Sequence, residues 1–127
     1  MTTTQSAVDR MRQEFIGKKL YVVLLIPTES VDEREAVRES HFEFVKELEH
    51  SGRLFMAGPF LNEQSDKPTG SGLFILRGGS RDEIDSIMQK DPYFLNGFRT
   101  YEINLWRMNE GFMAVNLNFS DKSLTLD

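Results

Sequence analysis

The order in which strand-like and helix-like segments alternate is the feature that most constrains how this chain folds. Residues 20–26 form an unbroken, β-branched apolar run, typical of a central strand covered on both faces. An amphipathic helix follows, and these residues recur on its apolar side at helical spacing: Val37, His41, Phe44, Val45 and Leu48. The remaining segments predict strands over 53–60 and 72–76, a helix that stops at Asp91-Pro92, and a strand over 100–106.

This β-α-β-β-α-β order is the split βαβ arrangement of ferredoxin-like folds, so we predict an α+β protein with a core over about 20–107. The chain has 127 residues, the size of one domain, and 39% of them are hydrophobic. Two further elements are expected outside the core. One is a short N-terminal helix over about 6–16, and the other is a C-terminal hairpin over about 113–127, where apolar and polar residues alternate.

A four-stranded sheet with helices on only one face leaves its other face bare. Pairing of two such faces in a two-fold dimer would cover them, so we expect a homodimer, or a higher homo-oligomer, of the dimeric α+β-barrel type. The terminal hairpin could extend this seal.

Composition restricts the partners and the location. The net charge of -5 has the wrong sign for a protein that follows nucleic-acid phosphates, so no nucleic acid is expected. No apolar run approaches the roughly 20 residues of a membrane span, and no signal peptide is recognisable, so we expect no membrane and a cytoplasmic location. The absence of cysteine agrees with a reducing compartment and excludes thiolate-held metals.

Two histidines are the candidates for proton transfer near neutral pH. His50 falls in the last turn of its predicted helix, where a cation suits the helix dipole. His41 lies on the apolar stripe of the same helix and should face the sheet. It is either a hydrogen-bonded core residue or a proton carrier that lines a pocket.

Asp91 and the segment Ala57-Gly58-Pro59 are the other unusual features. Asp91 is predicted at a helix C-terminus, where the macrodipole disfavours a carboxylate by up to about 1 kcal/mol. It either simply ends the helix before Pro92 or approaches His41, in which case it would hold the imidazole tautomer. Gly58 either admits close approach of a ligand or another backbone, or marks a bulge or strand end next to Pro59.

No cofactor or metal is expected. Gly70-Ser71-Gly72 ends a loop and opens a strand rather than a helix, so it is not a nucleotide-binding motif. His41 and His50 are nine residues apart and have no cluster of inward carboxylates around them, which argues against a catalytic metal site.

Several of these residues together resemble the YCII-related (YciI-like) family of small dimeric α/β proteins. The resemblance spans about residues 20–107. The matching features are Arg38-Glu39-Ser40-His41, Gly52, Ala57-Gly58-Pro59, Gly70, Gly72, Asp91-Pro92-Tyr93, Gly97 and Trp106.

The resemblance implies a ferredoxin-like fold, a dimeric barrel and a catalytic site built on His41 and Asp91. It also implies that Arg38 steadies an anionic substrate, and Gly58, Pro59 and Tyr93 are expected to contact that substrate. The implied chemistry is lyase or isomerase chemistry on ring compounds, since one relative removes chloride from a chlorinated hydroxyquinol. The N-terminal helix and the terminal hairpin lie outside the family's common core.

Four functions remain open, in this order. The first is a cofactor-free lyase or isomerase that acts on a small polar cyclic or aromatic-derived metabolite, with His41 as general base. The second is a module that binds a metabolite without converting it, and the third is a structural or assembly role for the hairpin. A haem- or flavin-assisted monooxygenase comes last, because beyond His41 the sequence offers no credible haem ligand.

Overall fold

The computed structural model describes residues 15–28 and 34–126, and these fall into two units. Among the described residues, the larger unit comprises those within 19–107, and the smaller one contains 15–18 and 108–126.

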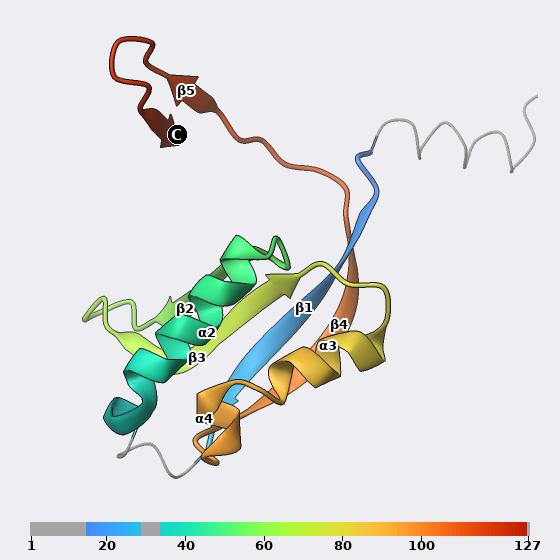
Figure 1. Ribbon diagram of the computed structural model, residues 1–127, viewed down its shortest axis with the longest axis vertical. Coiled ribbons are helices and arrows are strands. Elements are labelled where there is room, and N and C mark those ends of the chain that lie inside the picture. The colour runs from blue at the N-terminus through green and yellow to red at the C-terminus, as the bar shows by residue number, and fades with distance from the viewer. Residues whose placement is uncertain (1–14, 29–33, 127) are drawn as a thin grey trace, which may run out of the picture. The chain divides into compact units, whose positions relative to one another are not determined.

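The larger unit is a four-stranded sheet with helices on one face (Figure 1). Its elements, in chain order, are β1 (Lys18–Pro27), η1 (Arg34–Val37), α2 (Arg38–His50), β2 (Leu54–Leu61), β3 (Pro68–Leu76), α3 (Arg81–Met88), α4 (Pro92–Leu95) and β4 (Arg99–Met108). The strand order is β2-β3-β1-β4, and β3 runs antiparallel to both β1 and β2. The predicted ferredoxin-like α+β core is therefore confirmed.

The alternation of each strand decides which side chains reach the helices. In β1, Val23 and Leu25 are buried, and in β3 Phe74, which pairs with Val23, and Leu76 are buried on the same face. The helices close this layer with a second set of buried side chains, which consists of Leu48, Ile84 and Met88. This layer is the core of the unit. The face of α2 that carries His41 packs on it.

Strand β2 lies at the edge of the sheet, and it does not end at Pro59 but continues to Leu61. An edge strand tolerates proline because its missing N–H need not join a ladder. The register shifts between Leu54 and Met56 and again between Pro59 and Leu61, so the strand is irregular on both sides of Gly58.

The glycine on which the close approach of β2 and β3 depends is Gly72 rather than Gly58. A Cβ atom added at Gly72 would lie 2.7 Å from the carbonyl oxygen of Gly58 and 3.0 Å from Cα of Pro59. A Cβ atom at Gly58 would meet nothing within 4 Å. The close approach of another backbone, which the sequence suggested for Gly58, therefore depends on Gly72 of the neighbouring strand.

The ends of the helices agree only in part with the sequence prediction. Gly52, with φ of +79°, follows α2 in the left-handed conformation, as predicted. Helix α3 ends at Met88, not at Asp91, and a second short helix, α4, begins at Pro92. The predicted position of Asp91 at a helix C-terminus is therefore wrong. The residues Ser30-Val31-Asp32-Glu33, whose sequence predicts a capping box at the start of the first helix, lie outside the described residues.

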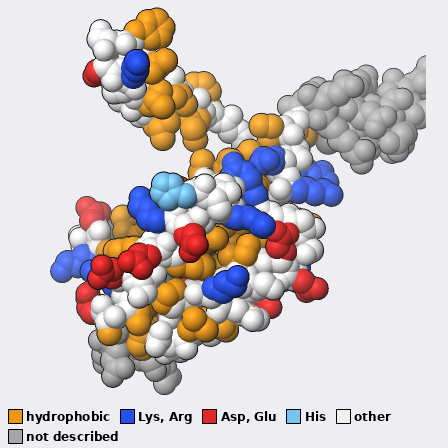
Figure 2. All heavy atoms as spheres, viewed as in Figure 1, with side chains coloured by type: hydrophobic (Ala, Val, Ile, Leu, Met, Phe, Trp, Pro, Cys, Tyr) orange, Lys and Arg blue, Asp and Glu red, His pale blue; other side chains and the backbone are white. Residues whose placement is uncertain are grey.

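The smaller unit contains a short antiparallel hairpin of β5 (Val115–Leu117) and β6 (Leu124–Leu126). Within this hairpin, Val115 pairs with Leu126 and Leu117 with Leu124. Hydrophobic side chains gather on the surface of the hairpin (Figure 2). In the described part of this unit, Phe112 and Phe119 are 89% and 86% exposed. The N-terminal helix expected over 6–16 lies outside the described residues except for its last two, which are not helical.

None of the helices in residues 15–28 and 34–126 has the length and apolar character that a membrane crossing requires. The expected dimer stays a prediction, because the structure contains a single chain.

Candidate active site

His41 is the fourth residue of α2, and its ring is held against the core by the apolar stripe of that helix. Val45 and Leu48 lie one and two turns further along the same face. His41 is 7% exposed, so a polar ring sits at the edge of the hydrophobic layer. A buried polar ring needs a hydrogen-bond partner, and the partner of His41 lies directly before the first residue of α4.

That partner is Asp91, which is fully buried. Nδ1 of His41 lies 2.8 Å from Oδ1 of Asp91. Since a carboxylate only accepts, Nδ1 carries the proton, and Nε2 is the accepting nitrogen of the neutral ring. The pair therefore sets the imidazole tautomer that a general base requires.

Asp91 holds its position because it is also the N-cap of α4. The backbone N–H of Tyr93 donates to Oδ1 of Asp91 at 3.0 Å, and Pro92 occupies the first helical position. A carboxylate at a helix N-terminus is favoured by the dipole, the reverse of the penalty expected from the sequence. Among the described residues, Oδ2 of Asp91 has no hydrogen-bond partner, although it is buried.

Aromatic rings surround the imidazole. The centroid of the Tyr93 ring lies 4.2 Å from that of His41, with the planes 23° apart. Phe74 lies nearly parallel to His41 at 6.3 Å, and Phe42 lies tilted at 5.9 Å. These rings exclude water from one side of His41 and restrict the orientation of the imidazole.

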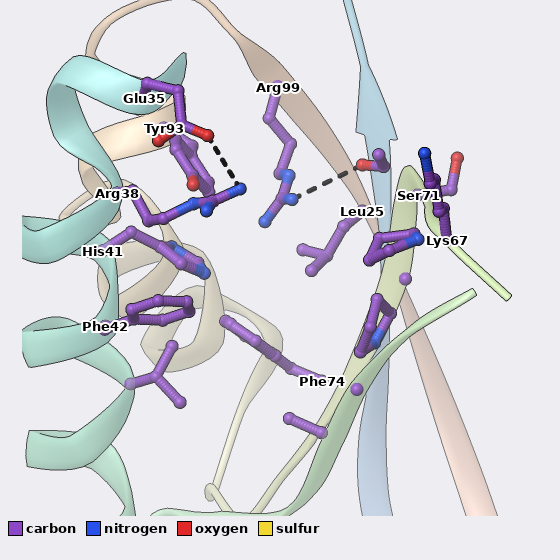
Figure 3. A pocket seen from close by; sticks show the side chains of 17 residues that line it. Leu25, Glu35, Arg38, His41, Phe42, Lys67, Ser71, Phe74, Tyr93 and Arg99 are labelled. Carbon is purple, nitrogen blue, oxygen red and sulfur yellow. Dashed lines mark hydrogen bonds and ion pairs between the residues drawn. The ribbon is translucent and has the colours of Figure 1, made fainter. Parts of the chain in front are cut away.

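His41 opens onto a cavity of about 590 Å³ between α2 and the β2–β3 end of the sheet (Figure 3). This volume is within the range of small-molecule sites. The sequence-predicted residues that line it are Arg38, His41, Gly58, Pro59 and Tyr93. Asp91 does not line the cavity but lies behind His41, to which it is hydrogen bonded.

The sequence reasoning missed several further lining residues, among them Phe42, Lys67, Phe74 and Arg99. Arg99 had a detectable signal, because it shares the parity of Tyr101 and Ile103 and so belongs to the helix-covered face of β4. A cation on an inward-facing position is unusual. Lys67 offered no signal, since it precedes the start of β3 in a polar loop.

Outside the cavity, one tyrosine is electrostatically perturbed. Burial, together with a hydrogen bond to Asp85 and the charge of that carboxylate, raises the pKa of Tyr101 to about 12. The described residues contain no group of three His, Cys, Asp or Glu side chains that could hold a metal ion.

Comparison with known proteins identifies the family to which this chain belongs. The family model described as YCII-related domain matches residues 19–107. The chain belongs to the YCII-related domain family. The match coincides with the larger structural unit of this YCII-related protein, so the smaller unit contributes residues that the family model does not cover. No curated protein matches the chain.

Among solved structures, this YCII-related chain is similar to 5-chloro-2-hydroxyhydroquinone dehydrochlorinase from Burkholderia phenoliruptrix AC1100, in complex with 2,5-dihydroxybenzoquinone. The TM-score is 0.58 at 20% sequence identity, and the match covers 68% of this chain and 92% of that chain. At this identity the likeness shows a common fold.

Proposed function

We propose that this protein is a cofactor-free lyase or isomerase that acts on a small polar cyclic or aromatic-derived molecule, with His41 as the general base. The observation that carries the proposal is the buried hydrogen bond between His41 and Asp91 at the wall of a cavity. A base that is oriented by a carboxylate and opens onto a pocket is the arrangement that proton abstraction requires.

In the proposed reaction, Nε2 of His41 takes a proton from a carbon or oxygen atom of the substrate. The released electron pair forms a new double bond within the substrate, and in a lyase reaction a leaving group departs with its own pair. In an isomerase reaction His41 returns the proton at another position. While His41 holds the proton, Asp91 stabilises the imidazolium, and in the lyase route the proton then passes to the departing group or to solvent. Neither route consumes an oxidant or a reductant.

The shape and chemistry of the cavity support a ring-shaped substrate. Phe42, Phe74 and Tyr93 provide flat apolar surfaces around His41, and Gly58 and Pro59 form part of the opposite wall. We propose that Arg38 faces the oxygen on which negative charge develops. The similar solved structure is that of a dehydrochlorinase named for a chlorinated hydroxyhydroquinone, with 2,5-dihydroxybenzoquinone bound, and both molecules are rings of this kind.

The test is turnover of chlorinated and hydroxylated ring compounds by wild type and by His41→Asn. A positioned general base contributes about 10²- to 10⁴-fold, so we expect kcat to fall by that factor. His50→Asn is the matched control, because His50 is exposed at the end of the same helix. Unchanged turnover in His41→Asn would end the proposal.

A second candidate is a binding module that does not convert its ligand. Asp91 also caps α4, so the His41–Asp91 pair can serve as a strut between α2 and α4 without any chemistry. Recovery of a bound ligand chemically intact after long incubation, with no product formed, would favour this role.

We also propose that the chain functions as one domain with terminal extensions and as a cytoplasmic homodimer. The face of the sheet away from the helices carries Val22, Leu24, Leu73 and Ile75, which are only partly buried, and Trp106, which is 40% exposed. Sedimentation velocity tests the proposed homodimer, and a monomer at micromolar concentration would refute the homodimer. A role of the exposed hairpin in assembly would be supported if deletion of residues 112–127 reduced the oligomer size.

A further inference from the structure

The cavity exists because β3 lacks side chains on part of its helix-covered face. Along that face, positions 70, 72, 74 and 76 are all buried. Phe74 and Leu76 fill the space beneath the helices as members of the hydrophobic core, whereas Gly70 and Gly72 have no side chain with which to fill it. Both glycines line the cavity, so part of one wall is bare strand backbone, to which a ligand can come close.

The wall that α2 provides carries an aromatic ring with free surface. Phe42 lines the cavity and is 57% exposed. Figure 3 shows Phe42 and His41 extending from α2 into the same space. The centroids of these two rings lie 5.9 Å apart, and their planes are inclined by 48°. A molecule that covers the ring of Phe42 is therefore a direct neighbour of the imidazole.

The rings of the other phenylalanine and of the tyrosine at the cavity are already covered by the protein. Phe74 is 3% exposed and belongs to the hydrophobic core. Tyr93 is 7% exposed, and its ring stacks on His41 and contacts the guanidinium of Arg99. Among the lining residues that the structure describes, Phe42 is thus the aromatic side chain with the most surface left for a ligand.

We infer that Phe42 selects a planar, conjugated ring, which lies in the slot between Phe42 and the β3 backbone at Gly70 and Gly72. This assignment rests on the proposed function and narrows its substrate class from cyclic to planar and conjugated. Two aromatic rings that stack with an offset gain more than the burial of the same apolar area provides. A saturated ring of the same size is puckered and has no π system, so it lacks that contribution.

The experiment is an NMR titration of the isotope-labelled protein with resorcinol (1,3-dihydroxybenzene) and with cyclohexane-1,3-diol. Both probes are uncharged and have the same ring size and hydroxyl positions. We expect wild type to bind resorcinol about 2- to 10-fold more tightly, the factor that an aromatic pair contributes beyond burial. Phe42→Leu keeps an apolar side chain without the flat ring. It should abolish this preference by weakening the binding of resorcinol while leaving that of the diol unchanged.

Two further variants show whether the flat ring at position 42 is the cause. Phe42→Trp restores an aromatic face and should keep the preference for resorcinol. Phe60→Leu is the matched control, because Phe60 is 44% exposed in the same unit and does not line the cavity. It removes an exposed ring by the same exchange, so both affinities should stay at the wild-type values. Both leucine variants should keep the wild-type urea midpoint, since neither side chain belongs to the core.

Equal binding of the two probes by wild type, or no binding of resorcinol at millimolar concentration, would overturn the inference. A Phe42→Leu variant that keeps the wild-type preference, or that loses affinity for both probes equally, would overturn it as well. A preference for resorcinol that depends on Phe42, together with full turnover in His41→Asn, would refute the base alone. Loss of turnover in His41→Asn, together with equal binding of the two probes, would refute the slot alone.

Discussion

Replacing Asp91 with alanine removes the acceptor of two buried hydrogen bonds at once. Oδ1 of Asp91 accepts from Nδ1 of His41 at 2.8 Å and from the backbone N–H of Tyr93 at 3.0 Å. Each buried donor left without a partner costs about 1–3 kcal/mol, so the loss of one acceptor that serves two donors costs a few kcal/mol. We therefore expect Asp91→Ala to lower the free energy of unfolding by about 3–5 kcal/mol.

Asp91→Asn separates the structural role of this side chain from its charge. The amide keeps the shape and an acceptor oxygen for the two donors, but both hydrogen bonds lose the charge that strengthens them, at about 1 kcal/mol each. Removal of a buried charge whose Oδ2 has no partner within the described residues offsets part of this loss. We expect a destabilisation below about 2 kcal/mol, together with loss of turnover.

Urea unfolding measures the free energy of unfolding of both variants. The protein concentration is kept the same throughout, because the stability of an oligomer depends on concentration. Glu43→Ala, at an exposed position of α2, is the control and should stay within about 0.5 kcal/mol of wild type. The reasoning is refuted if Asp91→Ala unfolds within about 1 kcal/mol of wild type. It is equally refuted if Asp91→Asn is as unstable as Asp91→Ala.

Three further predictions concern the fold around the site. Because the pKa of Tyr101 is raised to about 12, the difference in absorbance titration between wild type and Tyr101→Phe should have its midpoint near pH 12, and a midpoint at pH 10 would contradict this. The stabilisation that the raised pKa provides should be complete below pH 10 and should be lost as the pH rises through 12. Gly72→Ala should cost about 1–3 kcal/mol of unfolding free energy, since its Cβ would lie 2.7 Å from a backbone oxygen, whereas Gly58→Ala should be near neutral; equal costs in denaturant would count against the close strand approach. Ser80→Ala should cost about 1 kcal/mol, because the hydroxyl of Ser80 caps the first turn of α3; no change in the urea midpoint would show that the cap contributes nothing.

The fold was predictable because its signals are local and agree with one another. Short unbroken apolar runs identify β1 and β3 as strands of the core, and the burial of Val23 and Phe74 agrees with this. The helical stripe through His41 and Leu48 likewise predicted that both residues are buried.

The position of Asp91 was mispredicted because the dipeptide Asp91-Pro92 is compatible both with the end of one helix and with the start of the next. Asp before Pro is a common helix end, but Asp at the N-cap followed by Pro at the first helical position equally begins one. The sequence around Asp91 fits both, and α3 simply ends earlier, at Met88. The contact of Asp91 with His41 spans 50 residues, a distance over which periodicity carries no information.

The cations of the cavity were missed for a related reason. Arg99 contacts Gly70 and Tyr93, which lie on different elements, so the cluster exists only after the chain has folded. Arg38 was predicted as a site residue only through the resemblance to the family. No local pattern connects Arg38 with Arg99.

Transfer of a proton by His41 is tested most directly by deuterium incorporation. The ring compound that the protein converts is incubated in D₂O, and mass spectrometry follows deuterium in the recovered substrate and product. The proposed mechanism predicts incorporation with wild type and His50→Asn, and a rate lower by about 10²- to 10⁴-fold with a folded His41→Asn variant. Incorporation at the wild-type rate in His41→Asn would contradict the assignment of His41 as the base.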